Sequence, residues 1–229
     1  GDSITITGLT GTFVDDANVG DDKPVTVNAA GKSITGTDAS NYDVTIPTEA
    51  TGDILPKAIG IDWSNTTLTY NGMPQKPTAT ATGLVGEDAC TITVSGEQTN
   101  AGDSYTAEAT DLDNGNYQLP VEKNTTFSIA RKEVTAAPKN VTITRGSAIP
   151  AFELTYTGLL GEDTLTPSAD PAFTCYEKDG TTAVSTGTAA GTYTITWTNT
   201  DVFDGETNYR VVAATGTLTI NNPSSSGGS

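Results

Sequence analysis

Apolar and polar residues alternate along several short stretches of the chain. A period of two residues is typical of β-strands that bury one face and expose the other. No stretch carries the 3.6-residue period of a long helix. The apolar members of the four clearest stretches are Ile59, Ile61 and Trp63; Cys90, Ile92 and Val94; Val141 and Ile143; and Tyr193, Ile195 and Trp197.

Threonine occupies most of the polar positions in these stretches. The 229 residues include 44 threonines, 24 glycines and 11 prolines. Branched side chains fit a pleated surface, whereas glycine and proline favour turns. The composition therefore predicts an all-β protein whose strands are short and whose solvent face is lined with threonine.

Internal repetition organises the chain. The segment Gly-Leu-Val-Gly-Glu-Asp at 83–88 returns as Gly-Leu-Leu-Gly-Glu-Asp at 158–163, and an Asn-Tyr pair recurs at 41–42, 116–117 and 208–209. Gly8-Leu9 is matched to Gly83-Leu84, which lies 75 positions later. A fixed period is typical of an array of similar domains.

The anchors divide the chain into three units and a tail. We expect units at 1–56, 57–131 and 132–220, with an insertion in the last near 166–186, and a flexible Ser/Gly-rich tail at 221–229. The first unit has few residues ahead of Gly8, so we interpret it as N-terminally truncated and the chain as a piece of a longer protein. An unpaired sheet edge would remain there, which a neighbouring chain could fill.

Each unit has room for six or seven short strands separated by turn signals. This spacing predicts small antiparallel β-sandwich domains of the Ig-like kind. The alternative is a β-grasp-like repeat with one short helix, because Gly-Glu-Asp could begin a helical turn. Connectors between units are short, which predicts a stiff rod.

Several segments resemble the MBG and YDG tandem repeats of bacterial surface adhesins. Residues 11–27 and 37–42 are similar to the second half of a YDG repeat, and residues 69–77 resemble repeats of Gram-positive surface proteins. Residues 148–159 and 190–193 resemble an MBG repeat, although Arg145-Gly146 stands where Tyr-Gly is usual. The resemblance implies an extracellular protein of the bacterial cell surface with a stalk-like or adhesive role.

Composition excludes most catalytic and nucleic-acid functions. The chain has no histidine, so it has no imidazole base, and 28 acidic against 11 basic residues repel phosphate backbones. No apolar run approaches the roughly 20 residues that span a bilayer. We expect no enzyme activity, no nucleic-acid partner and no membrane insertion in this segment.

One acidic segment imitates a calcium loop. Asp111, Asp113 and Glu122 take the first, third and twelfth places, but Gly115 comes one place too early for the sharp turn. The counterparts in the other units lack this spacing, so a turn before the Asn-Tyr strand is the favoured interpretation. We expect no cofactor, with Ca²⁺ at these three residues as the alternative.

The remaining chemistry-bearing residues fit structural roles. Trp63 and Trp197 fall on the apolar phase of their strands, Cys90 falls on an apolar face, and Cys175 has no equivalent in the other units. If a binding surface exists, the insertion is the place to look, because variation in repeat arrays collects on one face.

The leading hypothesis is a non-catalytic, monomeric spacer that holds a distal module of an adhesin away from the cell. The alternative is a binding module for mucin or other host glycans and glycoproteins, which the resemblance implies for whole proteins only.

Overall fold

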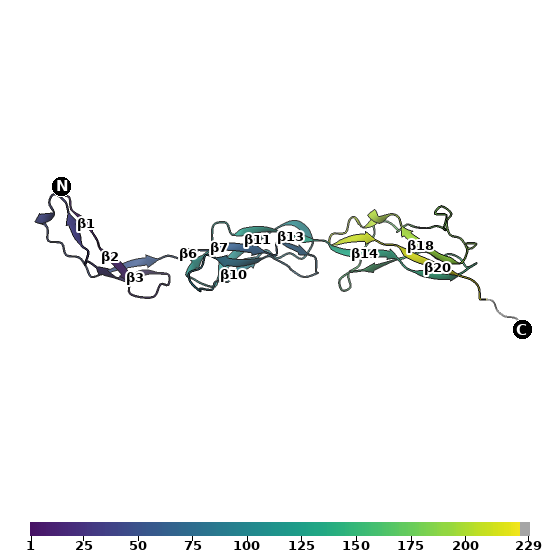
Figure 1. The fold of residues 1–229 in the computed structure, drawn as a ribbon, viewed down its shortest axis with the longest axis horizontal. Coiled ribbons are helices and arrows are strands. Elements are labelled where there is room, and N and C mark those ends of the chain that lie inside the picture. Colours follow the sequence, from purple (N-terminus) through teal and green to yellow (C-terminus); the bar gives the residue numbers. More distant parts are fainter. Residues whose placement is uncertain (225–229) are drawn as a thin grey trace. The chain divides into compact units, whose positions relative to one another are not determined.

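Short β-strands make up almost all of the regular secondary structure (Figure 1). A computed structural model describes residues 1–224, so most of the predicted tail at 221–229 lies outside the described residues. Within residues 1–224 there is no α-helix, and the helical elements are two 3₁₀ turns, η1 (Ala39–Asn41) and η2 (Thr200–Phe203). In the same range, no helix has the length and apolarity that a membrane crossing requires. The all-β prediction is confirmed.

The chain divides into two compact units. Unit 1 contains Gly1–Ser64, Thr78–Ser95 and Glu108–Asn124, whereas unit 2 contains Asn65–Pro77, Gly96–Ala107 and the chain from Thr125 onward. The division falls inside the predicted middle repeat, and one strand, β11 (Gly102–Leu112), contributes a half to each unit. The repeat boundaries drawn from the sequence stay a prediction.

Unit 1 consists of hairpins and short strand pairs. Its sheets are β2-β3-β5, β1-β4, β7-β9 and β6-β12, and β10 pairs with the second half of β11. The strands are β1 (Thr5–Thr7), β2 (Thr10–Phe13), β3 (Gly20–Asn28), β4 (Ser33–Thr35), β5 (Glu49–Ile54), β6 (Lys57–Ala58), β7 (Gly60–Ser64), β9 (Thr78–Thr82), β10 (Ile92–Ser95) and β12 (Tyr117–Gln118).

Unit 2 holds two sheets that face each other in its C-terminal part. Their orders are β16-β14-β19 and β15-β20-β18-β17, and β14 contacts both β18 and β20 across the gap. The strands are β8 (Thr67–Thr69), β13 (Asn124–Ala130), β14 (Lys132–Pro138), β15 (Val141–Thr144), β16 (Leu154–Thr157), β17 (Phe173–Cys175), β18 (Gly191–Trp197), β19 (Tyr209–Ala213) and β20 (Gly216–Asn221). Two packed sheets are the sandwich-like arrangement that the strand count predicts.

Apolar side chains of both sheets form the core of this sandwich. Ile195 and Leu218 are fully buried on neighbouring strands, and Val134 is fully buried on β14 of the facing sheet. Trp197 packs edge-on against Phe203, with ring centroids 5.7 Å apart. The period-two pattern therefore identifies the buried face of β18 correctly.

Parallel pairing is the main departure from the expected antiparallel sheets. The pairs β6–β12, β8–β13, β14–β19 and β15–β20 are parallel. Alternation predicts which face of a strand is buried but carries no information about the direction of its neighbour, because the side-chain period is the same in both sheet types.

The Gly-Glu-Asp segments form tight turns and not helical turns. Asp88 N donates to Val85 O at 3.1 Å, and Asp163 N donates to Leu160 O at 2.9 Å. The glycine at the second position of each turn has a positive φ, 57° at Gly86 and 51° at Gly161. A left-handed backbone at this place favours glycine, so its recurrence has a conformational cause.

Candidate functional site

A tyrosine–aspartate hydrogen bond recurs in all three Asn-Tyr segments. Each tyrosine hydroxyl donates to one carboxylate oxygen, and the sequence separation between the partners ranges from 29 to 46 residues. The donor–acceptor distances are 2.7 Å for Tyr42 and Asp2, 2.6 Å for Tyr117 and Asp88, and 2.5 Å for Tyr209 and Asp163.

Two of these tyrosines also accept a backbone hydrogen bond from the glycine turn. Val85 N donates to the Tyr117 hydroxyl at 2.9 Å, and Leu160 N donates to the Tyr209 hydroxyl at 3.2 Å. Each ring therefore ties the start of its strand to the Gly-Glu-Asp turn. Hydrogen bonding to Asp88 raises the pKa of Tyr117, whereas burial is the main cause that raises the pKa of Tyr209.

Asp2 was missed in the sequence, because Gly8-Leu9 was matched to Gly83-Leu84. In the structure Gly8 and Leu9 lie between β1 and β2, away from the tyrosine hydroxyl's partner. A usable signal was present: Asp2 precedes a Thr-Ile-Thr segment by three residues, as Asp88 does.

A joint within unit 1 connects the Asn116 side chain to the turn before β3. Asn116 Nδ2 donates to Asn18 Oδ1 at 2.7 Å, and Val19 N donates to Asn116 Oδ1 at 2.8 Å. The Asn116 carbonyl accepts from Lys57 N at 2.9 Å. One asparagine therefore links three points that the sequence assigns to two different repeats.

A matching joint lies within unit 2. Asn208 Nδ2 donates to Asn100 Oδ1 at 3.1 Å, Ala101 N donates to Asn208 Oδ1 at 2.9 Å, and Lys132 N donates to the Asn208 carbonyl at 2.9 Å. The two asparagine joints, Asn18–Asn116 and Asn100–Asn208, have the same donors and acceptors. Both begin with an Asn-x-Gly segment at the start of a long strand, a signal that was visible in the sequence but was not paired with Asn-Tyr.

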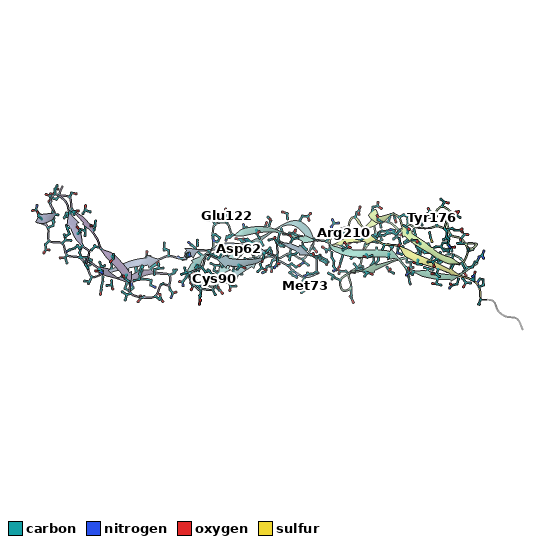
Figure 2. The ribbon with its side chains drawn as sticks, in the orientation of Figure 1. Asp62, Met73, Cys90, Glu122, Tyr176 and Arg210 are labelled. Atoms are coloured by element: carbon teal, nitrogen blue, oxygen red, sulfur yellow. The ribbon has the colours of Figure 1, made fainter. Side chains whose placement is uncertain are left out.

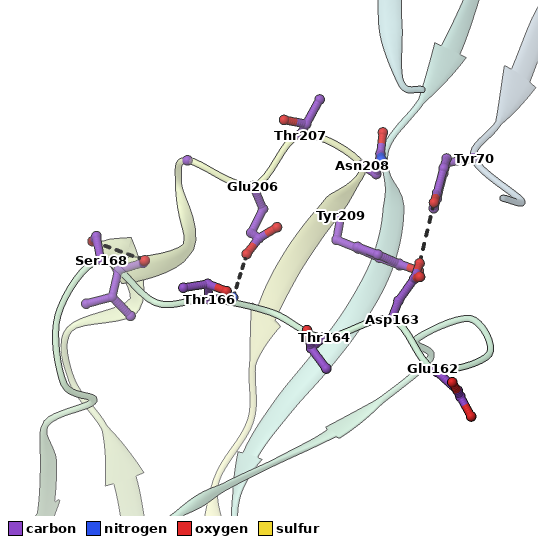
Figure 3. A pocket seen from close by; sticks show the side chains of 12 residues that line it. Tyr70, Glu162, Asp163, Thr164, Thr166, Ser168, Glu206, Thr207, Asn208 and Tyr209 are labelled. Carbon is purple, nitrogen blue, oxygen red and sulfur yellow. Dashed lines mark hydrogen bonds between the residues drawn. The ribbon is translucent and has the colours of Figure 1, made fainter. Parts of the chain in front are cut away.

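A polar cavity of about 680 Å³ lies beside the unit 2 joint (Figure 3). The Tyr70 ring meets Tyr209 edge-on at 5.4 Å, and its hydroxyl donates to Asp163 Oδ2 at 3.4 Å. Burial is the main cause that raises the pKa of Tyr70. The remaining lining side chains come from residues 162–168 and 202–208.

The chemistry of this cavity is acidic and hydroxylic. Glu162, Asp163 and Glu206 supply its carboxylates, and Glu206 Oε1 accepts from Thr166 N at 2.9 Å (Figure 3). Two of the three carboxylates are engaged as acceptors that hold local backbone and tyrosine groups. The cavity therefore offers hydrogen-bonding groups to a polar ligand but no histidine or cysteine to serve as base or nucleophile.

The predicted calcium residues have separate structural tasks in the structure. Asp111 Oδ1 accepts from Leu112 N at 2.9 Å, and Asp113 Oδ1 accepts from Thr91 N at 2.6 Å, the bond that most lowers the pKa of Asp113. Glu122 lies in the turn between β12 and β13 (Figure 2). Across residues 1–224, no three histidine, cysteine or acidic side chains converge as metal ligands. The expectation of no metal, with calcium at these residues as its alternative, stays a prediction.

The thiols and tryptophans differ in how deeply they are buried. Cys175 is buried and Cys90 is half-buried (Figure 2), both are free, and burial raises the pKa of each thiol. Trp197 is buried with its Nε1 donating to Asn199 Oδ1 at 3.0 Å, whereas Trp63 is half-buried on β7. Burial leaves the Trp197 ring without the open face that stacking on a sugar needs.

The predicted insertion forms an exposed hairpin-like turn and strand β17. Asp179 Oδ1 accepts from Thr181 N and Thr182 N, and the Thr182 hydroxyl donates to Asp179 Oδ2 at 2.5 Å. These bonds, the Thr182 hydroxyl first, lower the pKa of Asp179 to about 2. Tyr176 stands exposed beside this turn (Figure 2).

Comparison with protein families gives two matches. Residues 133–219 match the MBG domain (YGX type), and residues 1–51 match the YDG domain. No curated protein and no solved structure matches the chain. These families are in general non-catalytic, surface-associated binding or repeat modules, typical of extracellular surface proteins. The two matches are consistent with repeats of the MBG and YDG type, the resemblance that the motifs predict.

Proposed function

We propose that this chain is a stiff spacer within a bacterial cell-surface adhesin, where it holds a distal module away from the envelope. The observation that carries the proposal is the pair of asparagine joints. Each joint adds side-chain hydrogen bonds, spanning 98 residues at Asn18–Asn116 and 108 at Asn100–Asn208, to a connector of one or two residues. A short connector with fixed bonds on both sides restricts bending.

The surface chemistry supports this role. A formal charge of −17 and threonine-lined strands keep the exterior solvated and discourage association with other copies or with anionic surfaces. On these grounds the chain acts as a monomer outside the cell and carries out no catalysis.

Backbone ¹⁵N relaxation of the whole chain tests the stiffness. The expected result is that the amides of 1–56, 57–131 and 132–220 fit one anisotropic rotational diffusion tensor, as they do in a single rigid body. In the double variant Asn116→Ala, Asn208→Ala the three segments should tumble separately, each with a shorter rotational correlation time, because each joint loses its bridging amide.

The matched control is Asn140→Ala. Asn140 Oδ1 accepts from Thr217 N at 2.8 Å within one repeat, so its loss removes a similar bond without touching either joint. Independent tumbling of the three segments in the unaltered chain, or an equal effect of the control, would contradict the spacer proposal.

The cavity beside Tyr70 favours a second candidate, a binding module for mucin or other host glycans. Its hydroxyl and carboxylate groups suit the hydrogen bonds of a saccharide. A glycan array probed with the chain and with Glu206→Gln tests this function. Selective binding that Glu206→Gln weakens would support a lectin role, and no binding would leave the spacer role alone.

A further inference from the structure

Two Asn-Gly pairs occur in the sequence, at 71–72 and at 114–115. An asparagine amide is chemically labile, and it is least shielded before glycine, because glycine has no Cβ beside its backbone nitrogen. The two pairs share this chemistry, so their surroundings in the structure decide which of them reacts.

The first pair, Asn71-Gly72, lies in the exposed turn between β8 and β9. Within residues 1–224, neither Asn71 Nδ2 nor Gly72 N donates to another group. A Cβ on Gly72 would have one neighbour within 4 Å in that range, Leu160 Cδ1 at 3.8 Å. Both nitrogens are therefore open to water and need break no hydrogen bond to react.

A backbone donor is already in place at the side-chain oxygen of Asn71. Met73 N donates to Asn71 Oδ1 at 2.9 Å. When a nitrogen attacks the side-chain carbonyl, negative charge develops on Oδ1, and an N–H group that already points at this oxygen stabilises the transition state. The turn thus supplies an oxyanion donor next to a nucleophile, the nitrogen of Gly72.

The second pair, Asn114-Gly115, has the same kind of donor but a restrained side chain. Asn114 Oδ1 accepts from Asn116 N at 3.1 Å, and Asn114 Nδ2 donates to Ala89 O at 3.0 Å. The Asn114 side chain is also half-buried. Turning its amide toward Gly115 N must break the bond to Ala89, so the fold protects this pair.

We propose that Asn71 is a site of spontaneous deamidation, which converts it to aspartate and isoaspartate, and that Asn114 is protected. The Gly72 nitrogen loses its proton to water and bonds to Asn71 Cγ. The bond from Cγ to the side-chain nitrogen breaks, and that nitrogen takes a proton from water and leaves as ammonia. A five-membered cyclic imide remains.

Water then opens the imide in one of two ways. Breaking the bond between Gly72 N and Cγ gives aspartate with an ordinary main chain. Breaking the bond between Gly72 N and the main-chain carbonyl carbon of residue 71 gives isoaspartate, and the main chain then runs through Cγ. Both products add a negative charge, but only isoaspartate adds a methylene group to the main chain.

The reactive turn adjoins the asparagine joint of unit 2. On one side of the turn, Tyr70 is buried edge-on against Tyr209 and points toward Asp163 (Figure 3). On the other side, Gln75 and Gln98 exchange backbone hydrogen bonds of 2.8 Å and 2.9 Å. Because both ends of the turn are held, a longer main chain between them has to displace one of them.

The test incubates the complete chain in mildly alkaline buffer and follows the side-chain amide signals of Asn71 and Asn114 by ¹H–¹⁵N NMR. Asn71 should lose its signal about fivefold faster than Asn114 or more, because only Asn114 has to break a hydrogen bond first. Fragmentation mass spectrometry of the aged chain should find isoaspartate at position 71. Equal rates at the two sites, or faster loss at Asn114, would overturn the proposal.

A peptide of residues 67–77 and the variant Asn71→Gln are the matched controls. The peptide carries the same Asn-Gly pair without the fold, and Asn71 in the chain should react within about threefold of it, since local opening of an exposed turn costs little. Asn71→Gln should keep its side-chain amide, because a glutamine has to close a larger ring. A chain that reacts more than about tenfold more slowly than the peptide, or a glutamine lost as fast as Asn71, would contradict the proposed route.

The effect on the joint has its own comparison and rests on the proposed spacer function. The isoaspartate form, purified by ion exchange, and Asn71→Asp carry the same added charge. Exchange of the Tyr70 amide, which donates to Ala130 O at 2.9 Å, should be about fivefold faster in the isoaspartate form and change less than about twofold in Asn71→Asp. Equal exchange in the two would overturn the displacement of the turn. Amide loss at Asn71 is measured whether or not the three segments tumble as one body, so a failed spacer function and a failed deamidation site give different results.

Discussion

Residues 1–56 and residues 132–220 carry the same Asn-Tyr motif but bury very different amounts of surface. Tyr42 and Tyr209 both donate to an aspartate, at 2.7 Å and 2.5 Å. Around Tyr209, two facing sheets bury Val134, Ile195 and Leu218 completely, whereas no residue from 1 to 58 reaches full burial. The tyrosine–aspartate bond therefore forms with or without a buried core around it.

The difference lies in the strands that precede the glycine turn. β14 lies between β16 and β19 and contacts the facing sheet, whereas among residues 1–224 no strand pairs with 42–46. A strand that is paired along both edges and packs one face against a second sheet converts a set of hairpins into a sandwich, because the apolar faces of the two sheets then cover each other.

Core truncation should separate the two regions most strongly. Leu218→Ala removes a fully buried side chain and should cost about 3 kcal/mol, which is about a hundredfold loss of amide protection in β18 and β20. Ile6→Ala, at a side chain 41% exposed, should change protection in β3 and β5 by about twofold at most. Equal losses by native-state hydrogen exchange would show that 1–56 has a core of its own.

Removing the tyrosine hydroxyls should give the next largest contrast. Tyr209→Phe leaves Leu160 N without its acceptor and should destabilise unit 2 by about 1.5 kcal/mol. Tyr42→Phe breaks an exposed bond and should cost about 0.5 kcal/mol or less. Denaturant unfolding of each variant measures the two values, and the reverse order would break the comparison.

Alkaline titration of Tyr42 and Tyr209 sharpens the comparison between the two regions further. The pKa of Tyr42 is raised mainly by its bond to Asp2, and that of Tyr209 mainly by burial. A raised folded-state pKa keeps its contribution to stability below about pH 10 and loses it as pH rises through the folded value. Asp2→Asn should return the Tyr42 pKa to its ordinary range, while Asp163→Asn should leave Tyr209 still raised; tyrosine ¹³Cζ shifts measure both.

The smallest effect concerns two exposed carboxyls. Neutral donors lower the pKa of Asp179 to about 2, whereas Lys23 is the main cause that lowers the pKa of Asp16. Each contributes stability above its ordinary pKa that is lost as pH falls, for Asp179 between about pH 4 and pH 2. Added salt should raise the pKa of Asp16 and leave the pKa of Asp179 nearly unchanged, and NMR titration of the carboxyl carbons measures both.

Parts of the site were within reach of the sequence. Recurrence of Gly-Glu-Asp and Asn-Tyr is visible at a fixed spacing, but the hydroxyl bonds that join them are contacts between distant residues. The sequence does not reveal the bridging role of Asn18 and Asn100, because Asn-x-Gly is common in turns and only the partner 98 or 108 residues away distinguishes these two.

The sequence by itself determined the all-β class, the buried faces of strands such as β18, the repeated anchors and the resemblance of two segments to MBG and YDG repeats, because side-chain period and turn residues act locally. Tertiary structure alone decided the parallel direction of β6, β14 and β15 and the joints at Asn116 and Asn208. Those features depend on which backbone lies beside which, and loop closure over tens of residues leaves no periodic trace in the chain.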